Sequence, residues 1–388
     1  MRGGERCLEV LCELYPHADV YTLLHLPGRV SWSIEKMAIR TSFVQRLPRV
    51  ASLYRYYLPL YPLAIESFDL TGYDLVLSSS HCVAKGVLTP PGTCHIAYIH
   101  TPMRYIWEEF RSYFGRRQHG WLGRGVAQLL AHYLRLWDVG SAYRPDYLIA
   151  NSHHVAGRIR KYYGREAVVI HPPVDTRFFV PGDREDEYYL LVSAFAPYKR
   201  VDLAIEAFKA LRLPLKVVGE GQERKRLTRL AGGPVELLGW VDDHELAELY
   251  AGCRALVFPG LEDFGLTPLE AQACGRPVIA YGFGGVRESV VPLNLGGEES
   301  GAVAGEAASQ GAGGPGRRAA PTGVFFYEAV PEALARAVRA FEQHRDRFDP
   351  AAIRAHALQF DRAVFKERMQ AFIEASYNAH RVREARPC

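Results

Sequence analysis

Short apolar runs alternate with amphipathic, helix-like stretches along most of the 388-residue chain. This alternation is typical of βαβ units, in which helices connect parallel strands. One intervening stretch carries Leu203, Phe208 and Leu211 on a helical period. The sequence therefore predicts an α/β fold with parallel sheets. The expected strands are Tyr73–Ser78, His95–Ile99, Tyr147–Ala150, Ala167–Ile170, Tyr189–Val192, Leu215–Val218, Val235–Leu238, Ala255–Phe258, Val278–Ala280 and Gly323–Phe326.

The length of the chain predicts two domains, because a single core rarely serves a chain longer than about 250–300 residues. The stretch His171–Glu187 contains three prolines and a cluster of acids, and we interpret it as a linker. We therefore expect an N-terminal domain over residues 1–175 and a C-terminal domain over residues 176–360.

Two segments fall outside these cores. Residues 361–388 are expected to form a helix that crosses back to the first domain, with Phe365, Met369 and Ile373 on its apolar face. Residues 294–321 are dominated by Gly, Ala, Ser and Glu, and this composition predicts a flexible insertion.

Composition excludes several classes of protein. The net charge of +4 does not suggest a nucleic-acid partner, and no apolar run is long enough to span a membrane. The N-terminus lacks the apolar stretch of a signal peptide. The seven cysteines include no C-x-x-C pair, which argues against a zinc site or a disulfide framework. We expect a cytoplasmic protein.

The stretch from Arg104 to Arg165 is rich in Arg, Trp and Tyr. A pair of solvated helices with amphipathic side chains would explain this composition. A basic, aromatic surface that meets anionic lipid headgroups or a lipid-linked phosphate would explain it as well. Both interpretations remain open at this point.

The segment from Pro259 to Glu270 carries the strongest chemical signal. It follows a predicted strand, so it lies at the carboxyl edge of the sheet, where ligands of open α/β folds bind. Thr267 at the N-cap, Pro268 and Glu270 form a helix start, and Glu270 could simply close a capping box. The bare backbone of Phe264–Leu266, however, also suits a phosphate site at the helix N-terminus.

Glu262 and Glu270, with seven residues between them, resemble the E-x7-E motif of retaining family-4 glycosyltransferases, which have the GT-B fold of two facing Rossmann-like domains. The first half resembles a bacterial branch that includes O-antigen and capsule mannosyltransferases. The resemblance covers nearly the whole chain apart from the insertion. The stretches that carry it are Ser78–Gly86, His100–Tyr105, Pro197–Asp202, Val217–Gly221, Ala271–Ala280 and Gly284–Glu288.

The resemblance implies that the N-terminal domain is the acceptor side and that the C-terminal domain binds the nucleotide sugar. It implies roles for residues of this second domain. Glu270 would hold the ribose hydroxyls, and Glu262 would orient the transferred sugar. The backbone N–H groups around Phe264, Gly265, Leu266 and Thr267 would contact sugar and diphosphate. Lys199 would neutralise the diphosphate leaving group as charge develops on it.

It also implies roles in the first domain. His100 would face the donor sugar from the opposite domain; the alternative is a strand-end histidine bonded to backbone. Gly3 and Gly4 would form a turn near the phosphates. Ala194 stands where many family members have an Arg that contacts the diphosphate, so Arg104 or Arg200 is expected to compensate.

The N-terminus departs from the family pattern. Relatives begin with a strand that leads into the Gly-Gly-Glu turn, whereas here Met1 falls almost inside that turn. The first domain is then expected to lack its first central strand. A start assigned too far downstream, or a trimmed chain, would explain the difference.

Together these features predict a retaining hexosyltransferase of surface polysaccharide synthesis. The implied donor is GDP-mannose, the acceptor is a lipid-linked glycan or oligosaccharide, and peripheral contact with the inner membrane face is compatible. No metal or other cofactor is expected, since D-x-D is absent and the histidines lack ligand spacing. The alternatives are a UDP-sugar donor, a degenerate protein that only binds nucleotide sugar, and an epimerase of the same fold. A dinucleotide oxidoreductase would rest on Gly219–Gly221 alone, and Arg224 breaks its fingerprint.

Overall fold

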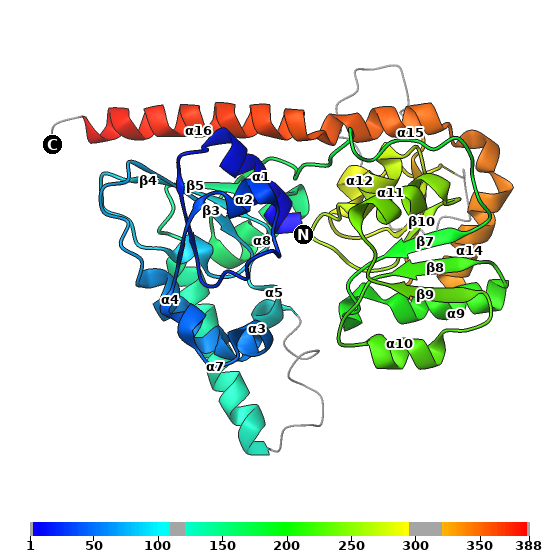
Figure 1. Ribbon diagram of the computed structural model, residues 1–388, viewed down its shortest axis with the longest axis horizontal. Coiled ribbons are helices and arrows are strands. Elements are labelled where there is room, and N and C mark those ends of the chain that lie inside the picture. The colour runs from blue at the N-terminus through cyan, green and yellow to red at the C-terminus, as the bar shows by residue number, and fades with distance from the viewer. Residues whose placement is uncertain (1–2, 109–120, 295–319, 386–388) are drawn as a thin grey trace. The chain divides into compact units, whose positions relative to one another are not determined.

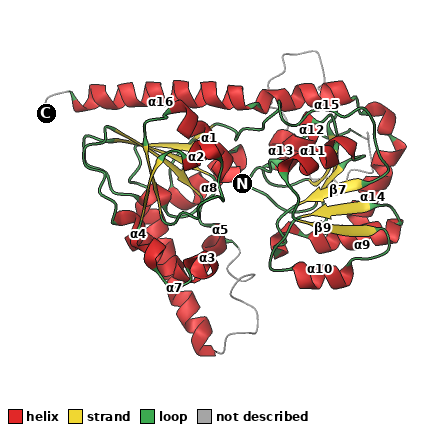
Figure 2. Cartoon of the chain, in the orientation of Figure 1, coloured by secondary structure: helices red, strands yellow, loops and turns green. Residues whose placement is uncertain are grey.

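The computed structural model describes residues 3–108, 121–294 and 320–385, and it contains two compact α/β units (Figures 1 and 2). The N-terminal unit comprises Met1–Pro173 together with Ala363–Cys388, and the C-terminal unit comprises Val174–Arg362. Residues 295–319, which make up most of the predicted insertion, lie outside the described residues. So do residues 109–120 of the stretch from Arg104 to Arg165 that is rich in Arg, Trp and Tyr.

The C-terminal unit is built on a six-stranded parallel sheet with the order β12-β11-β10-β7-β8-β9. All of its strands were predicted from the sequence, with boundaries that differ by at most one residue. The strands are β7 (Tyr189–Val192), β8 (Leu215–Val218), β9 (Val235–Gly239), β10 (Leu256–Phe258), β11 (Val278–Tyr281) and β12 (Gly323–Phe326).

Helices cover both faces of this sheet, as Figure 2 shows. Successive strand residues alternate between two cores: Leu191 and Val257 belong to one, whereas Leu190 and Leu256 belong to the other. This is the period-two pattern of a strand buried on both sides. The first core contains α9 (Val201–Leu211), α10 (Arg224–Leu230) and α14 (Pro331–Gln343); the second contains α11 (Asp243–Gly252), α12 (Thr267–Ala273), α13 (Val286–Ser289) and α15 (Pro350–Ala357).

The N-terminal unit contains two parallel sheets. One has the order β3-β4-β5-β6, and the other pairs β1 with β2. The hydroxyl of Tyr73, just before β3, lies 3.1 Å from that of Tyr21 in β1 and hydrogen-bonds the carboxylate of Asp19. The strands are β1 (Asp19–Thr22), β2 (Ala38–Thr41), β3 (Leu75–Ser80), β4 (Cys94–Ile99), β5 (Tyr147–Ala150) and β6 (Val168–Val169).

The four-stranded sheet is also covered on both faces. Ile96 and Tyr98 pack with α1 (Gly3–Leu14) and α16 (Arg362–Glu384), while Ala97 and Ile99 pack with α8 (His153–Tyr163). The last helix therefore packs on the N-terminal unit, as expected, through Phe365, Met369 and Ile373. The remaining helices are α2 (Trp32–Glu35), α3 (Val50–Leu53), α4 (Tyr61–Glu66), α5 (Arg104–Trp107) and α7 (Trp121–Ser141).

The unit boundary falls within the stretch that we interpreted as a linker, and residues 174–187 of that stretch belong to the C-terminal unit. Val174 and Phe179 are buried in its core. Val174 also forms a parallel bridge with Asp361, which ties this stretch to the segment before α16. A proline-rich composition identified a domain boundary but not how tightly the chain packs after it.

The N-terminal unit contains a buried ion pair between Lys85 and Asp138 of α7. Lys85 Nζ lies 2.6 Å from Asp138 Oδ1, and the two side chains are 1% and 0% exposed. The other carboxylate oxygen of Asp138 accepts hydrogen bonds from Trp107 Nε1 at 2.8 Å and the Tyr163 hydroxyl at 2.9 Å. Because both charges are paired and hydrogen-bonded, the network is tolerated in the core.

Replacing Asp138 with Ala should destabilise the N-terminal unit by about 3–5 kcal/mol, because it leaves the Lys85 ammonium buried and unpaired. Urea denaturation followed by tryptophan fluorescence reports mainly on this unit, which holds Trp32, Trp107, Trp121 and Trp137. Glu166→Ala, which breaks an exposed pair with Arg160, is the control and should leave the midpoint nearly unchanged. Equal urea midpoints for the two variants would contradict a stabilising role for the Lys85–Asp138 pair.

Candidate functional site

The strand order of the C-terminal unit reverses between β7 and β10. From this pair, β8 and β9 extend to one side and β11 and β12 to the other. The loops that leave the carboxyl ends of the pair therefore diverge and open a crevice, which is where open α/β sheets bind ligands. A small pocket lies there, lined by Leu191, Val192, Ser193, Lys199, Val257, Phe258, Pro259, Gly260 and Glu262.

Lys199 and Glu262, both predicted site residues, meet in this pocket as an ion pair. Their side chains are 19% and 13% exposed, so the charges are largely shielded from solvent. Lys199 ends the short 3-10 helix Pro197–Lys199, which the left-handed conformation of Arg200 (φ 52°) terminates. An incoming diphosphate would compete for the Lys199 ammonium, and Glu262 would then be available to accept hydrogen bonds from a sugar.

Two glycines hold the loop that carries Glu262. The N–H of Gly285 donates to the carbonyl of Glu262 at 2.9 Å. A Cβ on Gly284 would lie 2.4 Å from that same carbonyl oxygen, and a Cβ on Gly285 would lie 2.1 Å from the carbonyl oxygen of Asp263. No other residue fits at these positions, so the Gly-Gly pair after β11 fixes the backbone that positions Glu262.

A second close backbone approach supports the loop after β7. The Phe195 N–H donates to the carbonyl of Glu220 at 2.8 Å. Gly219, with φ 142°, would place a Cβ 1.8 Å from the carbonyl oxygen of Ser193. The glycines that could suggest a dinucleotide fingerprint therefore serve loop packing beside the pocket.

The start of α12 differs from the prediction. Leu266 is the N-cap residue, Thr267 is the first helical residue, and the N-cap side chain makes no capping hydrogen bond. The capping-box alternative for Glu270 is therefore wrong. Phe264 is 3% exposed and packs in the core, so only its backbone is available to a ligand, and Gly265 adopts φ 90° beside it. The phosphate site at this helix start stays a prediction.

Glu270 is buried, with 6% of its surface exposed. Its Oε2 accepts a hydrogen bond from the Tyr250 hydroxyl at 2.7 Å. Burial, and then the nearby Glu270 carboxylate, raise the pKa of the Cys274 thiol to about 12. The sequence did not indicate Tyr250, because its helix α11 is separate from the motif and a single aromatic residue gives no chemical signal.

The candidate residues of the N-terminal unit lie around the carboxyl end of β4. His100 Nε2 lies 2.8 Å from the Ser79 hydroxyl, and the His100 N–H donates to the carbonyl of Ser80 at 2.8 Å. Burial, and then the charge of His81, lower the pKa of His100 to about 3, so its imidazole is neutral at physiological pH. The contact of His100 with a donor sugar stays a prediction.

Gly3 and Gly4 open helix α1 and do not form the separate turn that the resemblance implied. A Cβ on Gly4 would lie 3.4 Å from His100 Nε2, so this helix start is packed against the histidine. Arg104 opens α5, and the Arg200 guanidinium pairs with Asp202 at 3.5 Å. The exposed Ala194 follows β7. Compensation for the missing Arg by either cation stays a prediction.

Solved structures share this fold along nearly the whole chain. Sucrose-phosphate synthase from Thermosynechococcus elongatus superposes with a TM-score of 0.68 and 18% identity, and the match covers 96% of this chain and 92% of that one. HepE from Anabaena, solved in complex with UDP, superposes with a TM-score of 0.64 and 16% identity, with 96% of each chain covered. At these identities the likeness establishes the fold alone.

Residues 175–309 match the family model described as "Glycosyl transferases group 1". The fold is GT-B, and the matched residues begin where the C-terminal unit begins. Lys199, Glu262 and Glu270 lie within residues 175–309, so the match includes the predicted site residues of the second half.

Curated relatives match the chain over part of their length. A D-inositol 3-phosphate glycosyltransferase of Geodermatophilus obscurus is 37% identical over 179 residues, which cover 37% of this chain and 40% of the relative. An uncharacterized glycosyltransferase of Methanocaldococcus jannaschii is 30% identical over 151 residues, covering 38% of this chain and 43% of that protein. The chain thus spans less than half the length of these two relatives.

Substituting Gly285 with Ala should loosen the loop of Glu262, because the new Cβ must displace the backbone of Asp263. We expect a loss of stability of about 1–3 kcal/mol, as for other overpacked positions. Hydrogen-exchange mass spectrometry should find faster amide exchange in peptides that span residues 259–267. Gly92→Ala is the control, because its Cβ meets nothing within 4 Å. Unchanged exchange in the Gly285 variant would show that the loop does not need this glycine.

Proposed function

We propose that the chain is a retaining glycosyltransferase of the family-4 type, which moves a hexose from a nucleoside diphosphate sugar to an acceptor hydroxyl. The observation that carries this proposal is the Lys199–Glu262 pair in the switch-point pocket, within the residues that match the group 1 family model. A partly buried cation beside a carboxylate offers one group for a diphosphate and one for sugar hydroxyls.

The proposed reaction assigns each residue a step. Glu270, from the first turn of α12, accepts hydrogen bonds from the ribose hydroxyls. Lys199 binds the diphosphate, and its charge stabilises the negative charge that grows as the bond from the anomeric carbon to the phosphate oxygen breaks. Glu262 orients the sugar through its hydroxyls. The acceptor oxygen forms its bond on the same face, and its proton passes to the departing phosphate oxygen.

GDP-mannose is the first candidate donor, because the N-terminal half resembles mannosyltransferases of surface polysaccharide synthesis. A UDP-sugar is the second candidate, favoured by the complexes of HepE with UDP and with UDP-glucose. Both donors present the same diphosphate to Lys199. They differ only in the base and the sugar, so a binding measurement separates them.

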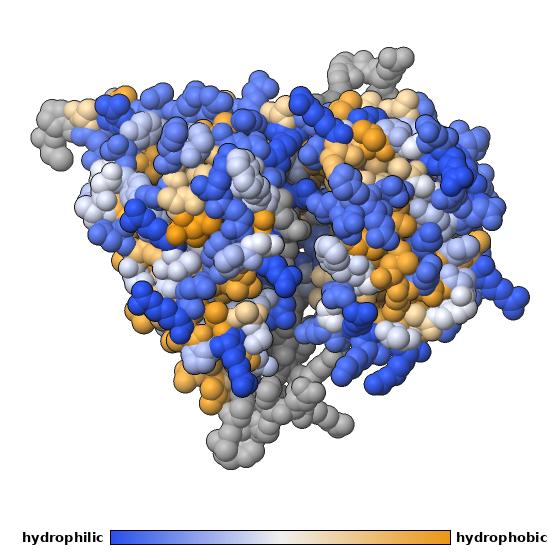
Figure 3. Space-filling model, in the orientation of Figure 1, coloured by the Kyte–Doolittle hydropathy of each residue, from blue (hydrophilic) through white to orange (hydrophobic). Residues whose placement is uncertain are grey.

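A lipid-linked acceptor at a membrane surface is part of the proposal. Helix α7 exposes apolar side chains at helical spacing, and Figure 3 shows hydrophobic residues at the surface of this part of the N-terminal unit. No helix among the described residues has the length and apolar character to cross a bilayer. Peripheral contact through α7 would suit a polyprenyl-linked glycan. The exposed residues are Val126, Leu129, Leu130, Tyr133 and Leu136.

Thermal-shift titration with GDP, UDP, ADP and NAD tests the donor assignment. A nucleotide at 100 times its dissociation constant should add about 2.7 kcal/mol of stability. A shift with GDP supports GDP-mannose, and a shift with UDP replaces it by a UDP-sugar. No shift with any nucleotide would favour the degenerate, non-catalytic alternative.

Matched variants make this titration specific to the site. Glu270→Gln should abolish most of the shift, because the amide lacks the negative charge and has one acceptor oxygen in place of two. Tyr250→Phe keeps the carboxylate and removes only its hydrogen bond, so it should retain the shift. Lys199→Ala should lower turnover more than nucleotide affinity. An undiminished shift in Glu270→Gln would remove Glu270 from the donor site.

Leu129→Glu should weaken binding to vesicles of phosphatidylglycerol and phosphatidylcholine, because it places a charge on the apolar face of α7. Leu129 is 70% exposed, so the substitution leaves the fold intact. Flotation of protein with vesicles measures the bound fraction. Leu358→Glu, at a position 44% exposed in the C-terminal unit, is the control. Equal flotation of both variants and the parent chain would exclude α7 as the membrane-facing surface.

A further inference from the structure

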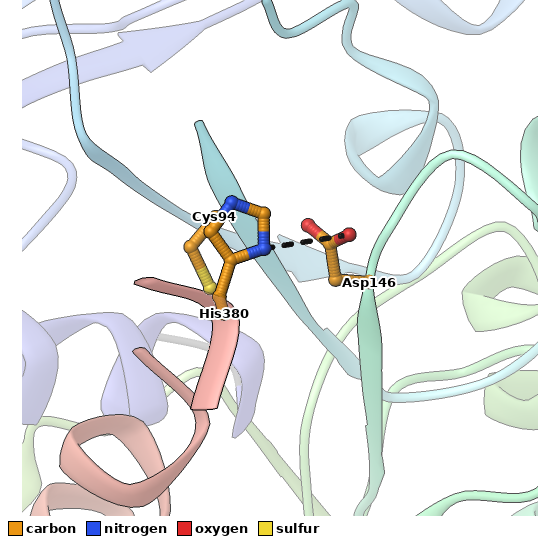
Figure 4. A group of neighbouring side chains, drawn as sticks. All are labelled: Cys94, Asp146 and His380. Carbon is orange, nitrogen blue, oxygen red and sulfur yellow. Dashed lines mark ion pairs between the residues drawn. The ribbon is translucent and has the colours of Figure 1, made fainter. Parts of the chain in front are cut away.

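Three potential metal ligands from distant parts of the sequence converge at one edge of the N-terminal sheet. Cys94 is the first residue of β4, Asp146 directly precedes β5, and His380 lies near the end of α16. One ligand atom from each, a sulfur, an oxygen and a nitrogen, lies within 4.8 Å of the other two. Figure 4 shows the three side chains directed toward one another from these separate elements.

His380 is the least expected member of the cluster. It continues the buried stripe of α16 that begins with Phe365 and Met369, and it is only 6% exposed. Its Nδ1 lies 3.8 Å from Asp146 Oδ1, and its Nε2 has no hydrogen-bond partner among the described residues. A separation of 3.8 Å is longer than a hydrogen bond, so Nδ1 and the Asp146 carboxylate face each other with space for an ion that binds both.

The other two ligands are prepared for the same role. Asp146 Oδ2 accepts the His95 N–H at 2.8 Å, which orients the carboxylate and leaves Oδ1 directed at His380. Cys94 is fully buried beneath them. Asp146 is exposed and gives an ion access from solvent.

We propose that Cys94, Asp146 and His380 form a binding site for a divalent transition metal, with Zn²⁺ as the best-fitting ion. Thiolate, imidazole and carboxylate are the protein ligands of Zn²⁺, and together they supply two negative charges for it. In a tetrahedral zinc site neighbouring ligand atoms are about 3.5 Å apart, so the observed spacing needs only small side-chain movements. Solvent occupies the fourth position on the exposed side.

The site is separate from the proposed sugar-nucleotide chemistry. Cys94 begins β4, whereas His100 follows its last residue, and a strand of this length places them roughly 20 Å apart at about 3.3 Å per residue. The metal would fasten the last helix to β4 and to the start of β5. Its expected effect is therefore on the stability of the N-terminal unit and on the attachment of α16.

Metal content and cobalt spectroscopy test this proposal on the untagged, full-length chain. After loading with Zn²⁺ and dialysis, the parent protein should retain one zinc ion per chain. Cys94→Ser and His380→Gln should each lower the affinity for Zn²⁺ by more than about a hundredfold. Co²⁺ should give a near-ultraviolet thiolate charge-transfer band that Cys94→Ser removes. Asp146→Asn keeps an oxygen acceptor for the His95 N–H, so it should lower the affinity for Zn²⁺ less than the other two substitutions do.

Cys7→Ser is the matched control, because Cys7 is buried in the same apolar cluster as Cys94 but lies outside the ligand group. It should keep both the bound zinc and the cobalt band. Zinc should also raise the melting temperature of the parent and of Cys7→Ser, and not of the ligand variants. Equal zinc retention in all variants, or no retained zinc in the parent, would overturn the proposal, and circular dichroism without metal verifies that each variant is folded.

Discussion

The candidate site depends on the close backbone approach between the loop of Glu262 and the Gly-Gly pair after β11. The distances leave no room for a Cβ at Gly284 or Gly285, so the two loops can share a hydrogen bond and a short parallel bridge. The similar approach of Gly219 to Ser193 fixes the loop after β7. Gly260, after β10, also approaches the backbone of Lys199 closely, because a Cβ there would lie 3.0 Å from Lys199 Cα. With these loops fixed, Lys199 and Glu262 are brought together as an ion pair.

The two units differ in which helices cover the faces of their parallel sheets. A parallel sheet must be covered on both faces, and in the C-terminal unit consecutive helices do this locally. In the N-terminal unit one face is covered by α1 and by α16, which comes from the far end of the chain. A metal bound by Cys94, Asp146 and His380 would strengthen this attachment, which otherwise rests on apolar contacts and on a few polar ones such as Lys366 with Glu13.

Buried charge has distinct roles in different parts of the molecule. Lys85 and Asp138 are fully paired and surrounded by aromatic donors, so they specify how α7 and α8 pack. Lys199 and Glu262 keep some exposure, which the proposed exchange of partners with a ligand requires. Lys85 lies within Ser78–Gly86, one of the stretches that carry the family resemblance, and there its role is to hold the fold.

The sequence by itself determined the α/β class, the strands of the C-terminal sheet and the last helix, and it predicted Lys199, Glu262 and Glu270 as site residues. These follow from local periodicity and a short motif, which a chain displays before it folds. It missed β1 and β2, because these strands are short, polar and only partly buried. Only the tertiary structure paired Glu270 with Tyr250, replaced the capping box with a Leu266 N-cap and assembled Cys94, Asp146 and His380. Such contacts join residues that are far apart in the chain. A metal-site motif is recognised by ligands at short, fixed spacing in the sequence, so it cannot reveal three ligands that strand order and the packing of α16 bring together.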